Sequence, residues 1–309
     1  MLESLLKRPK KIIIFGSEGN LGGQLMRILG NEYRLVCLDK KDLDIRNKEE
    51  VFNIVENHNP DIIINTVAYN AVDKCEENEE EYAKAKLLSA DATGFSAQAA
   101  LNIGALHIHY SSDYVFGAYD GEDLKKIKKQ GGFKEDDEPR PNCNYARAKL
   151  MGEKEVLKYA QEGLKYYIIR TSKLFGPKGV SELAKASFFE TMLKFSEEKN
   201  KLDVVDGEES CFTYTFDLAK ETLKLIEEKK DFGIYHIVNR NSYTWFDALK
   251  LFFNLKKIKT ELNPVSSDFF PRLAKRPEYS ALKNTKLKPM RKLKEALKEY
   301  IKNDFSDNK

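Results

Sequence analysis

Two residues four apart, Tyr145 and Lys149 in the segment YARAK, suggest acid–base chemistry. On a helix this spacing puts both side chains on one face, about 5–6 Å apart at Cβ. A phenol with a pKa of about 10 is a poor acid–base group at neutral pH, and a neighbouring ammonium is expected to lower that pKa. Ser112 ends the strand-like segment LHIHYSS, where its hydroxyl would hold a substrate carbonyl while Tyr145 donates a proton. Together the three residues predict reduction of a carbonyl group.

A second pattern, Gly16-Ser17-Glu18-Gly19-Asn20-Leu21-Gly22, lies between a strand-like run and a helical one. Glycine permits the positive φ of a tight turn and lets a pyrophosphate approach the backbone, and the helix that follows favours phosphate at its N-terminus. Asp39 ends the second strand-like run, 17 residues after Gly22, where dinucleotide folds keep a carboxylate for the adenosine ribose. Asp39 disfavours a 2′-phosphate, whereas Lys40 and Lys41 would neutralise one. The pattern predicts NADPH or NADH as the cofactor and leaves that choice open.

Strand-like and helical segments alternate through the first half of the chain and position these motifs. Apolar runs predict buried strands at 11–15, 33–39, 61–65, 105–112 and 165–171. Helical spacing predicts helices at 21–29, 49–57, 78–104 and 145–161, the third bent near Gly94. This alternation predicts an α/β fold, a Rossmann-type doubly wound parallel sheet with helices on both faces. The charged and glycine-containing segment 122–139 is expected to be an exposed, mobile loop.

After residue 172 the alternation loosens. Helical segments are expected at 181–198, 216–229 and 244–255, with strand-like segments at 202–205 and 233–238. We expect residues 1–172 to form an NAD(P)-binding Rossmann domain, with returning segments near 200–231. Residues 173–309 are expected to form mainly a smaller α+β substrate-binding domain.

Composition and charge exclude several other classes. The 309 residues carry 52 Lys+Arg and 49 Asp+Glu, a net charge of +3, and 41% are hydrophobic, which is enough for a large core. No run approaches the ~20 apolar residues of a membrane span, and MLESLLKRPK lacks the features of a secretory signal, so we expect a cytoplasmic protein. The segment RKLKEALKEYIK predicts an amphipathic helix packed through Leu293, Leu297, Tyr300 and Ile301, and not a nucleic-acid site.

Neither the cysteines nor the histidines predict a metal site. The four cysteines lie far apart with no CxxC pair, so we expect reduced, structural thiols at Cys37, Cys75, Cys143 and Cys211. His107 and His109 share one face of a strand, where packing is the better interpretation because no acidic or cysteine partner is in register.

With these motifs in place, the chain resembles the extended short-chain dehydrogenase/reductases and, among them, the dTDP-4-dehydrorhamnose reductase family. The stretches that carry the resemblance span nearly the whole chain: IIIFGSEGNLGGQL, LDKKDLDI, PDIIINTVAYNAVDKCE, HIHYSSDYVFGAYDG, FKEDDEPRPNCNYARAKLMGE, IIRTSKLFG, VVDGEESCFTYTFDLA and KRPEYSALKNTKL. The resemblance implies that NAD(P)H reduces the 4-keto group of a nucleotide-linked 6-deoxy sugar, with Ser112, Tyr145 and Lys149 as the catalytic triad.

The resemblance also implies two sets of binding residues. Cofactor contacts are implied at Gly16, Ser17, Gly19, Asn20, Leu21, Asp39, Asp44, Ile45, Ala68, Tyr69, Tyr145 and Lys149. Substrate contacts are implied at Asn70, Val72, Ser112, Asp113, Tyr114 and Lys173.

The departures from the family pattern fall on the substrate side. The family reads Arg-Thr-Ser-Trp where this chain has Arg170-Thr171-Ser172-Lys173, so a cation replaces an aromatic wall, and Asn70 replaces a threonine. Lys173 would contact a phosphate or point to solvent. The expected function is reduction of dTDP-4-dehydro-L-rhamnose for cell-surface polysaccharide biosynthesis, with a homodimer as one expected assembly. Two alternatives stay open: a catalytically silent regulatory subunit, like the β-subunit of methionine adenosyltransferase, and a sugar-nucleotide epimerase or dehydratase.

Overall fold

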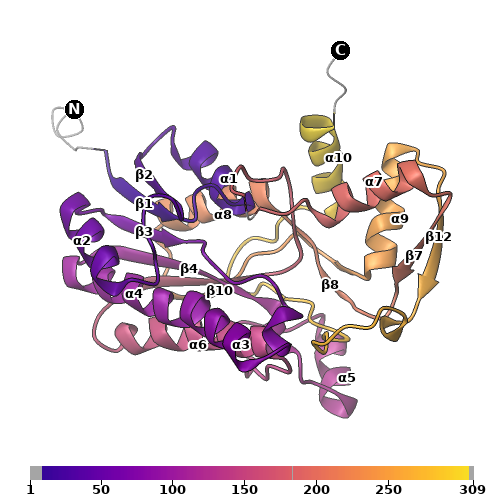
Figure 1. Cartoon of the computed structure of the whole chain (residues 1–309), viewed down its shortest axis with the longest axis horizontal. Helices are drawn as coiled ribbons and strands as arrows, with labels where there is room; N and C mark the ends of the chain where they lie inside the picture. Colours follow the sequence, from indigo (N-terminus) through magenta and orange to yellow (C-terminus); the bar gives the residue numbers. More distant parts are fainter. Residues whose placement is uncertain (1–8, 183, 306–309) are drawn as a thin grey trace.

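A computed structural model describes residues 9–182 and 184–305 of the chain (Figure 1). Most of the segment in which no secretory signal was expected therefore lies outside the described residues. The strands are β1 (Lys11–Phe15), β2 (Arg34–Leu38), β3 (Ile62–Asn65), β4 (Leu106–Ser112), β5 (Lys165–Thr171), β6 (Leu174–Phe175), β7 (Lys201–Val205), β8 (Ser210–Cys211), β9 (Thr213–Tyr214), β10 (Gly233–His236), β11 (Ser242–Tyr243) and β12 (Glu261–Val265). The helices are α1 (Asn20–Leu29), α2 (Lys48–His58), α3 (Glu79–Lys86), α4 (Ala92–Ile103), α5 (Gly121–Gln130), α6 (Asn144–Ala160), α7 (Phe188–Glu198), α8 (Thr215–Glu227), α9 (Trp245–Lys256) and α10 (Leu293–Asp304).

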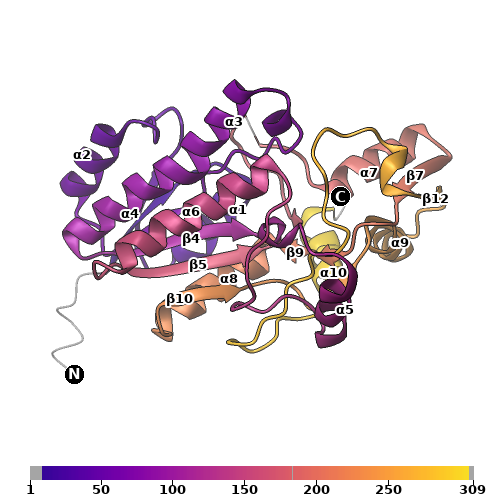
Figure 2. The same ribbon diagram turned by 90° about the horizontal axis from the view of Figure 1, so that it is seen from below.

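Six parallel strands form the central sheet in the order β10-β5-β4-β3-β1-β2. The runs IIIF and IIIN are buried on both faces, as a sheet covered by helices on both sides requires. Figure 2 shows α4 and α6 on one face of the sheet and α8 on the other, where α8 packs with α1. The predicted doubly wound α/β fold is confirmed. The strand order reverses between β1 and β3, so the glycine turn after β1 opens at the point where such sheets bind ligands.

A smaller lobe, made of β7, β12, α7, α9 and α10, lies beside the carboxyl end of this sheet (Figure 1). Strand β7 pairs with β12 in a two-stranded parallel sheet, a partner that the sequence did not suggest. The core of the lobe is rich in aromatic rings, among them Phe175, Phe189 and Phe252. The amphipathic C-terminal helix was predicted correctly, because Leu293, Leu297 and Tyr300 of α10 are fully buried in this core.

Two sequence expectations about local structure are wrong, and the irregularity expected near Gly94 lies a few residues earlier. Segment 122–139 is not a mobile loop: α5 occupies its first half, with Leu124, Ile127 and Phe133 buried in one apolar cluster. The irregularity in the long helix is a π-helical turn at Leu87–Asp91, before Gly94. Helix α7 begins only at Phe188, because a capping box between Ser187 and Glu190 fixes its start there.

The thiols and histidines are structural in this fold. All four cysteines are free, and three of them are buried. His107 and His109 have no exposed surface, and burial lowers the pKa of His107 to about 3 and that of His109 well below its usual value. Among the described residues, no cluster of three potential metal ligands forms and no helix is long and apolar enough to cross a membrane.

Candidate active site

Ser112 and Tyr145 meet at the carboxyl end of the sheet. Ser112 is the last residue of β4, and Tyr145 lies in the first turn of α6, which packs on β4. A hydrogen bond joins the Ser112 hydroxyl to the Tyr145 phenol. The ring of Tyr114 stands edge-on to that of Tyr145, with the centroids 5.6 Å apart. The fold therefore brings together a serine and a tyrosine that are 33 residues apart in the sequence.

Lys149 lies one helical turn after Tyr145 and is buried. Its Nζ donates a 2.6 Å hydrogen bond to the carbonyl oxygen of Tyr110 on β4. Burial lowers the pKa of Lys149 to about 8, although the charge of Glu153 opposes the shift. The spacing YxxxK thus places the lysine under the active-site edge and ties it to the sheet.

The expectation that Lys149 lowers the pKa of Tyr145 is wrong for this structure. Burial raises the pKa of the Tyr145 phenol, and the hydrogen bond with Ser112 opposes this shift only in part. Desolvation disfavours the charged phenolate, while the Lys149 ammonium is directed to the main chain of β4. Tyr145 is therefore protonated at neutral pH, the state that a proton donor needs.

Asp113 follows Ser112 and accepts hydrogen bonds from hydroxyl groups of three segments. Its carboxylate accepts hydrogen bonds from Ser112 Oγ at 3.2 Å, Ser172 Oγ at 2.7 Å and Ser280 Oγ at 2.6 Å. Burial raises the pKa of Asp113, and the hydrogen bonds from Ser280 and Ser172 and the charge of Lys173 oppose this shift. Asp113 therefore links the end of β5 and the C-terminal segment to the serine at the reacting edge.

The glycine turn has the shape of a phosphate cradle. Gly16 has a φ of +79°, and a Cβ there would lie 2.6 Å from Thr66 Oγ1. A Cβ on Gly22 would lie 2.1 Å from the Gly16 carbonyl oxygen, so only glycine lets α1 start this close to the turn. Asp39 at the end of β2 accepts a 3.1 Å hydrogen bond from the Glu18 amide. These features fit a dinucleotide whose pyrophosphate lies on the N-terminus of α1 and whose ribose reaches Asp39.

Other predicted cofactor residues of this turn have a structural task as well. Asn20 accepts a 3.0 Å hydrogen bond from the Gly179 amide and donates one to the Lys185 carbonyl, so its side chain ties Gly179 and Lys185 to the turn. The Leu21 side chain is buried in the core, and Ser17 and Gly19 lie in the turn itself. Lys41 forms an ion pair with Glu18 at the rim.

The remaining predicted cofactor residues follow β2 and β3. The Asp44 carboxylate is bound by Arg46, which lowers the pKa of Asp44, and Ile45 beside it is buried. Ala68 and Tyr69 follow β3 and are half-buried. The Tyr69 hydroxyl bonds to Glu81, and burial together with that carboxylate raises the pKa of Tyr69 to about 12.

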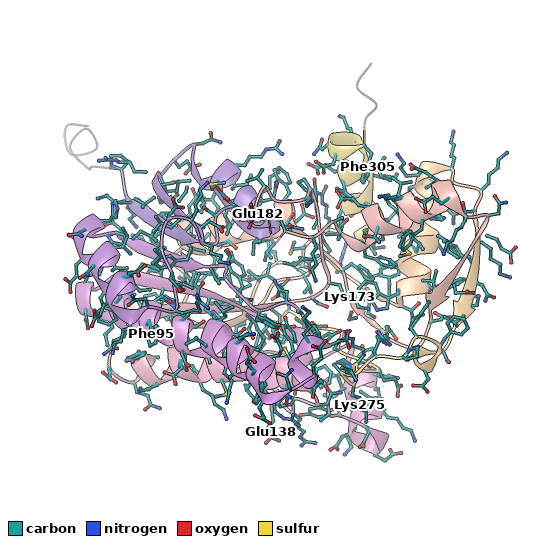
Figure 3. The ribbon with its side chains drawn as sticks, in the orientation of Figure 1. Phe95, Glu138, Lys173, Glu182, Lys275 and Phe305 are labelled. Atoms are coloured by element: carbon teal, nitrogen blue, oxygen red, sulfur yellow. The ribbon has the colours of Figure 1, made fainter. Side chains whose placement is uncertain are left out.

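The predicted substrate residues differ in their surroundings. Val72 packs against the same small apolar cluster as Tyr114 and Tyr145, whereas Asn70 is exposed. The expectation that Lys173 points to solvent is wrong, because its Nζ lies 4.0 Å from the centroid of the Trp245 ring. Figure 3 places Lys173 between the central sheet and the smaller lobe.

Sequence reasoning missed several residues that surround this site. They are Ser172, Ser280, Glu208, Trp245, Arg272 and Arg276. Arg276 pairs with Asp73, and Ala274 beside it packs on Tyr114 and Tyr145. The stretch KRPEYSALKNTKL contains Arg276 and Ser280 and carried part of the family resemblance, so it held a signal. Glu208 likewise lies in the stretch VVDGEESCFTYTFDLA, which carried part of the resemblance, whereas nothing local in the sequence marked Trp245.

Comparison with known proteins identifies the family to which this fold belongs. The family described as the RmlD substrate binding domain matches residues 10–305. The chain therefore belongs to this family, and it is an oxidoreductase of the extended short-chain dehydrogenase/reductase type.

Named relatives match the chain along nearly its whole length. The spore coat polysaccharide biosynthesis protein SpsK of Bacillus subtilis is 31% identical over 94% of this chain and 96% of its own length. A crystal structure of a dTDP-4-dehydrorhamnose reductase from Clostridium acetobutylicum matches with a TM-score of 0.82 and 34% identity, covering 94% of this chain and 98% of that one. A dTDP-4-dehydrorhamnose reductase from Bacillus anthracis, solved in complex with NADP, matches with a TM-score of 0.85 and 32% identity, covering 95% and 99%.

Proposed function

We propose that this chain uses NADPH or NADH to reduce the 4-keto group of a nucleotide-activated 6-deoxy sugar, most directly dTDP-4-dehydro-L-rhamnose to dTDP-L-rhamnose. One observation carries the proposal. Tyr145 and Ser112 lie together at the sheet edge that also holds the glycine cradle, with Lys149 buried one turn away. The relatives named dTDP-4-dehydrorhamnose reductase support the choice of substrate.

Each residue of the triad has its own role in the proposed reaction. The nicotinamide, when bound, supplies the hydride that adds to C4 of the sugar. Tyr145 donates its phenolic proton to the ketone oxygen as that oxygen gains charge, so ketone, hydride and proton give the alcohol. Ser112 orients the ketone oxygen toward the phenol. Lys149 contributes positive charge one helical turn from the phenolate that remains after transfer, at pH values below its pKa of about 8.

The binding assignments are part of the same proposal. The cofactor set is Gly16, Ser17, Gly19, Asn20, Leu21, Asp39, Asp44, Ile45, Ala68, Tyr69, Tyr145 and Lys149. The substrate set is Asn70, Val72, Ser112, Asp113, Tyr114 and Lys173. Asn20 and Leu21 would serve through their backbone amides, because their side chains are engaged elsewhere. We extend the proposal to a cytoplasmic location, to a homodimer and to the division into a cofactor-binding domain (1–172) and a mainly substrate-binding one (173–309).

The test is a reductase assay with four nucleotides. Purified protein is offered 4-keto-6-deoxyhexoses linked to dTDP, UDP, GDP or CDP, with NADH and NADPH in separate reactions, and loss of reduced-cofactor absorbance is followed. We expect oxidation with the dTDP-linked ketone and formation of dTDP-L-rhamnose, identified by NMR. Absence of oxidation with every donor would overturn the proposal and favour a regulatory subunit. NAD that copurifies and stays bound through turnover would favour an epimerase or dehydratase.

A further inference from the structure

A lysine in an unusual backbone conformation follows β5 at the reacting edge. Lys173 has a φ of +36°, in the left-handed region that residues other than glycine and asparagine rarely adopt. Its carbonyl accepts a 3.2 Å hydrogen bond from the Thr213 amide, which fixes the strained turn against β9. Such strain persists where surrounding contacts impose it, and it is frequent at functional sites.

The Lys173 ammonium lies against two aromatic rings of the smaller lobe. Its Nζ is 4.0 Å from the centroid of the Trp245 ring and 4.9 Å from that of Phe212. These distances are within the range of favourable cation–π contacts. Among residues 9–182 and 184–305, Nζ has one hydrogen-bond acceptor, the Glu208 carbonyl oxygen at 3.1 Å. An ammonium carries three N–H donors, so two more can reach other acceptors.

Glu208 fixes both members of this pair. Its main-chain carbonyl accepts from Lys173, and its buried carboxylate accepts a 3.1 Å hydrogen bond from Trp245 Nε1. The same carboxylate forms an ion pair with Arg272. The indole is also packed edge-on against Phe188, with the centroids 4.6 Å apart. The lysine and the tryptophan are therefore held in one geometry before any ligand arrives.

The Lys173 charge interacts with Asp113, the carboxylate that also accepts a hydrogen bond from the catalytic serine. Ser172, the residue before Lys173, donates to Asp113, and Asp113 also accepts from Ser112. Burial lowers the pKa of Lys173 to about 8, and the charges of Asp113, Glu208, Cys211 and Glu209 oppose this shift. The half-buried cation is therefore linked through Asp113 to Ser112, the residue expected to bind the substrate ketone.

We propose that Lys173, held against Trp245, determines substrate specificity by donating a hydrogen bond to an oxygen of the nucleotide sugar, on the sugar ring or on the diphosphate, and that Trp245 and Glu208 position it. This inference rests on the proposed function, because it assigns the ligand of the same site. An oxygen acceptor would replace the water that the ammonium loses, whereas an apolar group would desolvate it without compensation. The wall formed by Lys173 and Trp245 therefore favours substrates that present an oxygen atom to the Lys173 ammonium.

Trp245 provides a direct probe, since it is the single tryptophan in the chain. The experiment titrates dTDP, and separately dTDP-L-rhamnose, into wild type, Lys173→Met and Lys173→Arg while tryptophan emission is recorded. We expect saturable changes in the wild type, a Kd roughly tenfold to a hundredfold higher in Lys173→Met, and only a small loss in Lys173→Arg. Lys201→Met, which changes an exposed lysine of β7, is the matched control and should bind as the wild type does.

The two ligands distinguish the two sources of oxygen. If the Kd for dTDP depends on Lys173, the diphosphate is the partner; if only the Kd for dTDP-L-rhamnose depends on it, the partner is a sugar hydroxyl. Lys173→Met binding both ligands as tightly as the wild type overturns the inference. Trp245→Phe keeps a ring but loses the donor to Glu208, so we expect a severalfold rise in KM with kcat nearly unchanged, measured with the reductase assay.

A pH titration adds a readout that a merely structural lysine would not move. Emission of Trp245 should change with a midpoint near the Lys173 pKa of about 8, and this step should vanish in Lys173→Met. Saturating ligand should move the midpoint upward, because an oxygen acceptor favours the charged ammonium. An unmoved midpoint contradicts the inference. Binding through Lys173 without reduction of any 4-keto sugar would overturn the proposed function alone, whereas reduction that is unaffected in Lys173→Met would overturn this inference alone.

Discussion

The glycine turn and the wall formed by Lys173 and Trp245 lie on the same sheet edge but are built differently. The turn is one continuous stretch, Gly16 to Gly22, completed by Asp39 a short distance along the chain. The wall joins Lys173 after β5, Glu208 after β7 and Trp245 at the start of α9. The first is set by local backbone requirements and the second by tertiary packing.

This difference separates two demands on the site. A dinucleotide presents the same pyrophosphate whatever the substrate, so a backbone cradle with few side-chain contacts serves it. A sugar must be distinguished by its substituents, which requires side chains from several elements in fixed positions. One departure from the family pattern, Lys173, falls in the second region, where it contacts Trp245 and the Glu208 carbonyl.

Loss of the proton donor should have the largest effect and should leave both regions intact. Tyr145→Phe removes the acidic hydroxyl, so we expect kcat to fall roughly 10²–10⁴-fold. The Kd for NADPH and for dTDP should stay within about twofold, measured by fluorescence. Tyr166→Phe, a half-buried tyrosine elsewhere on β5, is the control with full activity. Turnover that is unchanged in Tyr145→Phe would refute the assignment of the donor.

A methyl group in the cradle should damage the first region alone. Gly16→Ala places a Cβ 2.6 Å from Thr66 Oγ1 at a φ of +79°, so the turn must shift and cofactor affinity should fall on the order of a hundredfold. Gly104→Ala has a similar φ of +71° but open space around it, so it should cost about 1–2 kcal/mol of stability and leave cofactor affinity unchanged. Equal cofactor affinity in both variants would argue against the cradle.

The pH dependence of turnover should separate the two lysines. Above the Lys149 pKa of about 8 the ammonium beside the active site is lost, so log kcat should fall with rising pH, and Lys173→Met should keep this limb. Lys149→Arg stays charged and should move the limb to higher pH. Because the folded-state pKa of Lys149 is lowered, the unfolded chain binds the extra proton between about 8 and 10.4, and this residue's contribution to stability rises with pH in that window. If the fall of log kcat above pH 8 disappears in Lys173→Met, the titrating group is Lys173 and not Lys149.

The smallest effect is expected at the ribose end of the first region. Asp39→Asn removes the charge that opposes a 2′-phosphate next to Lys40 and Lys41, so the ratio of kcat/KM for NADPH over NADH should rise about tenfold. Asp123→Asn, an exposed carboxylate on α5, is the control. A ratio that does not change would mean that Asp39 does not select the cofactor.

Much of the fold was predictable because its signals are local. The buried strand runs IIIF and IIIN, the glycine turn and the helix that carries YxxxK each follow from neighbouring residues. The features that the sequence did not predict depend on contacts between residues far apart in the chain. Segment 122–139 looks solvent-exposed by composition, yet Phe133 and the buried Glu135 are held by contacts with residues near 282–285. The pairing of β7 with β12 likewise joins residues 60 apart.

The sequence by itself determined the α/β architecture and the glycine turn and predicted Tyr145 as the proton donor, because periodicity, glycine placement and helical spacing act over a few residues. Only the tertiary structure decided how the donor is tuned and what faces it. Desolvation, set by everything packed around Tyr145 and Lys149, outweighs the charge of one neighbour. The position of Lys173 depends on a tryptophan and a glutamate that come next to it only when the chain has folded.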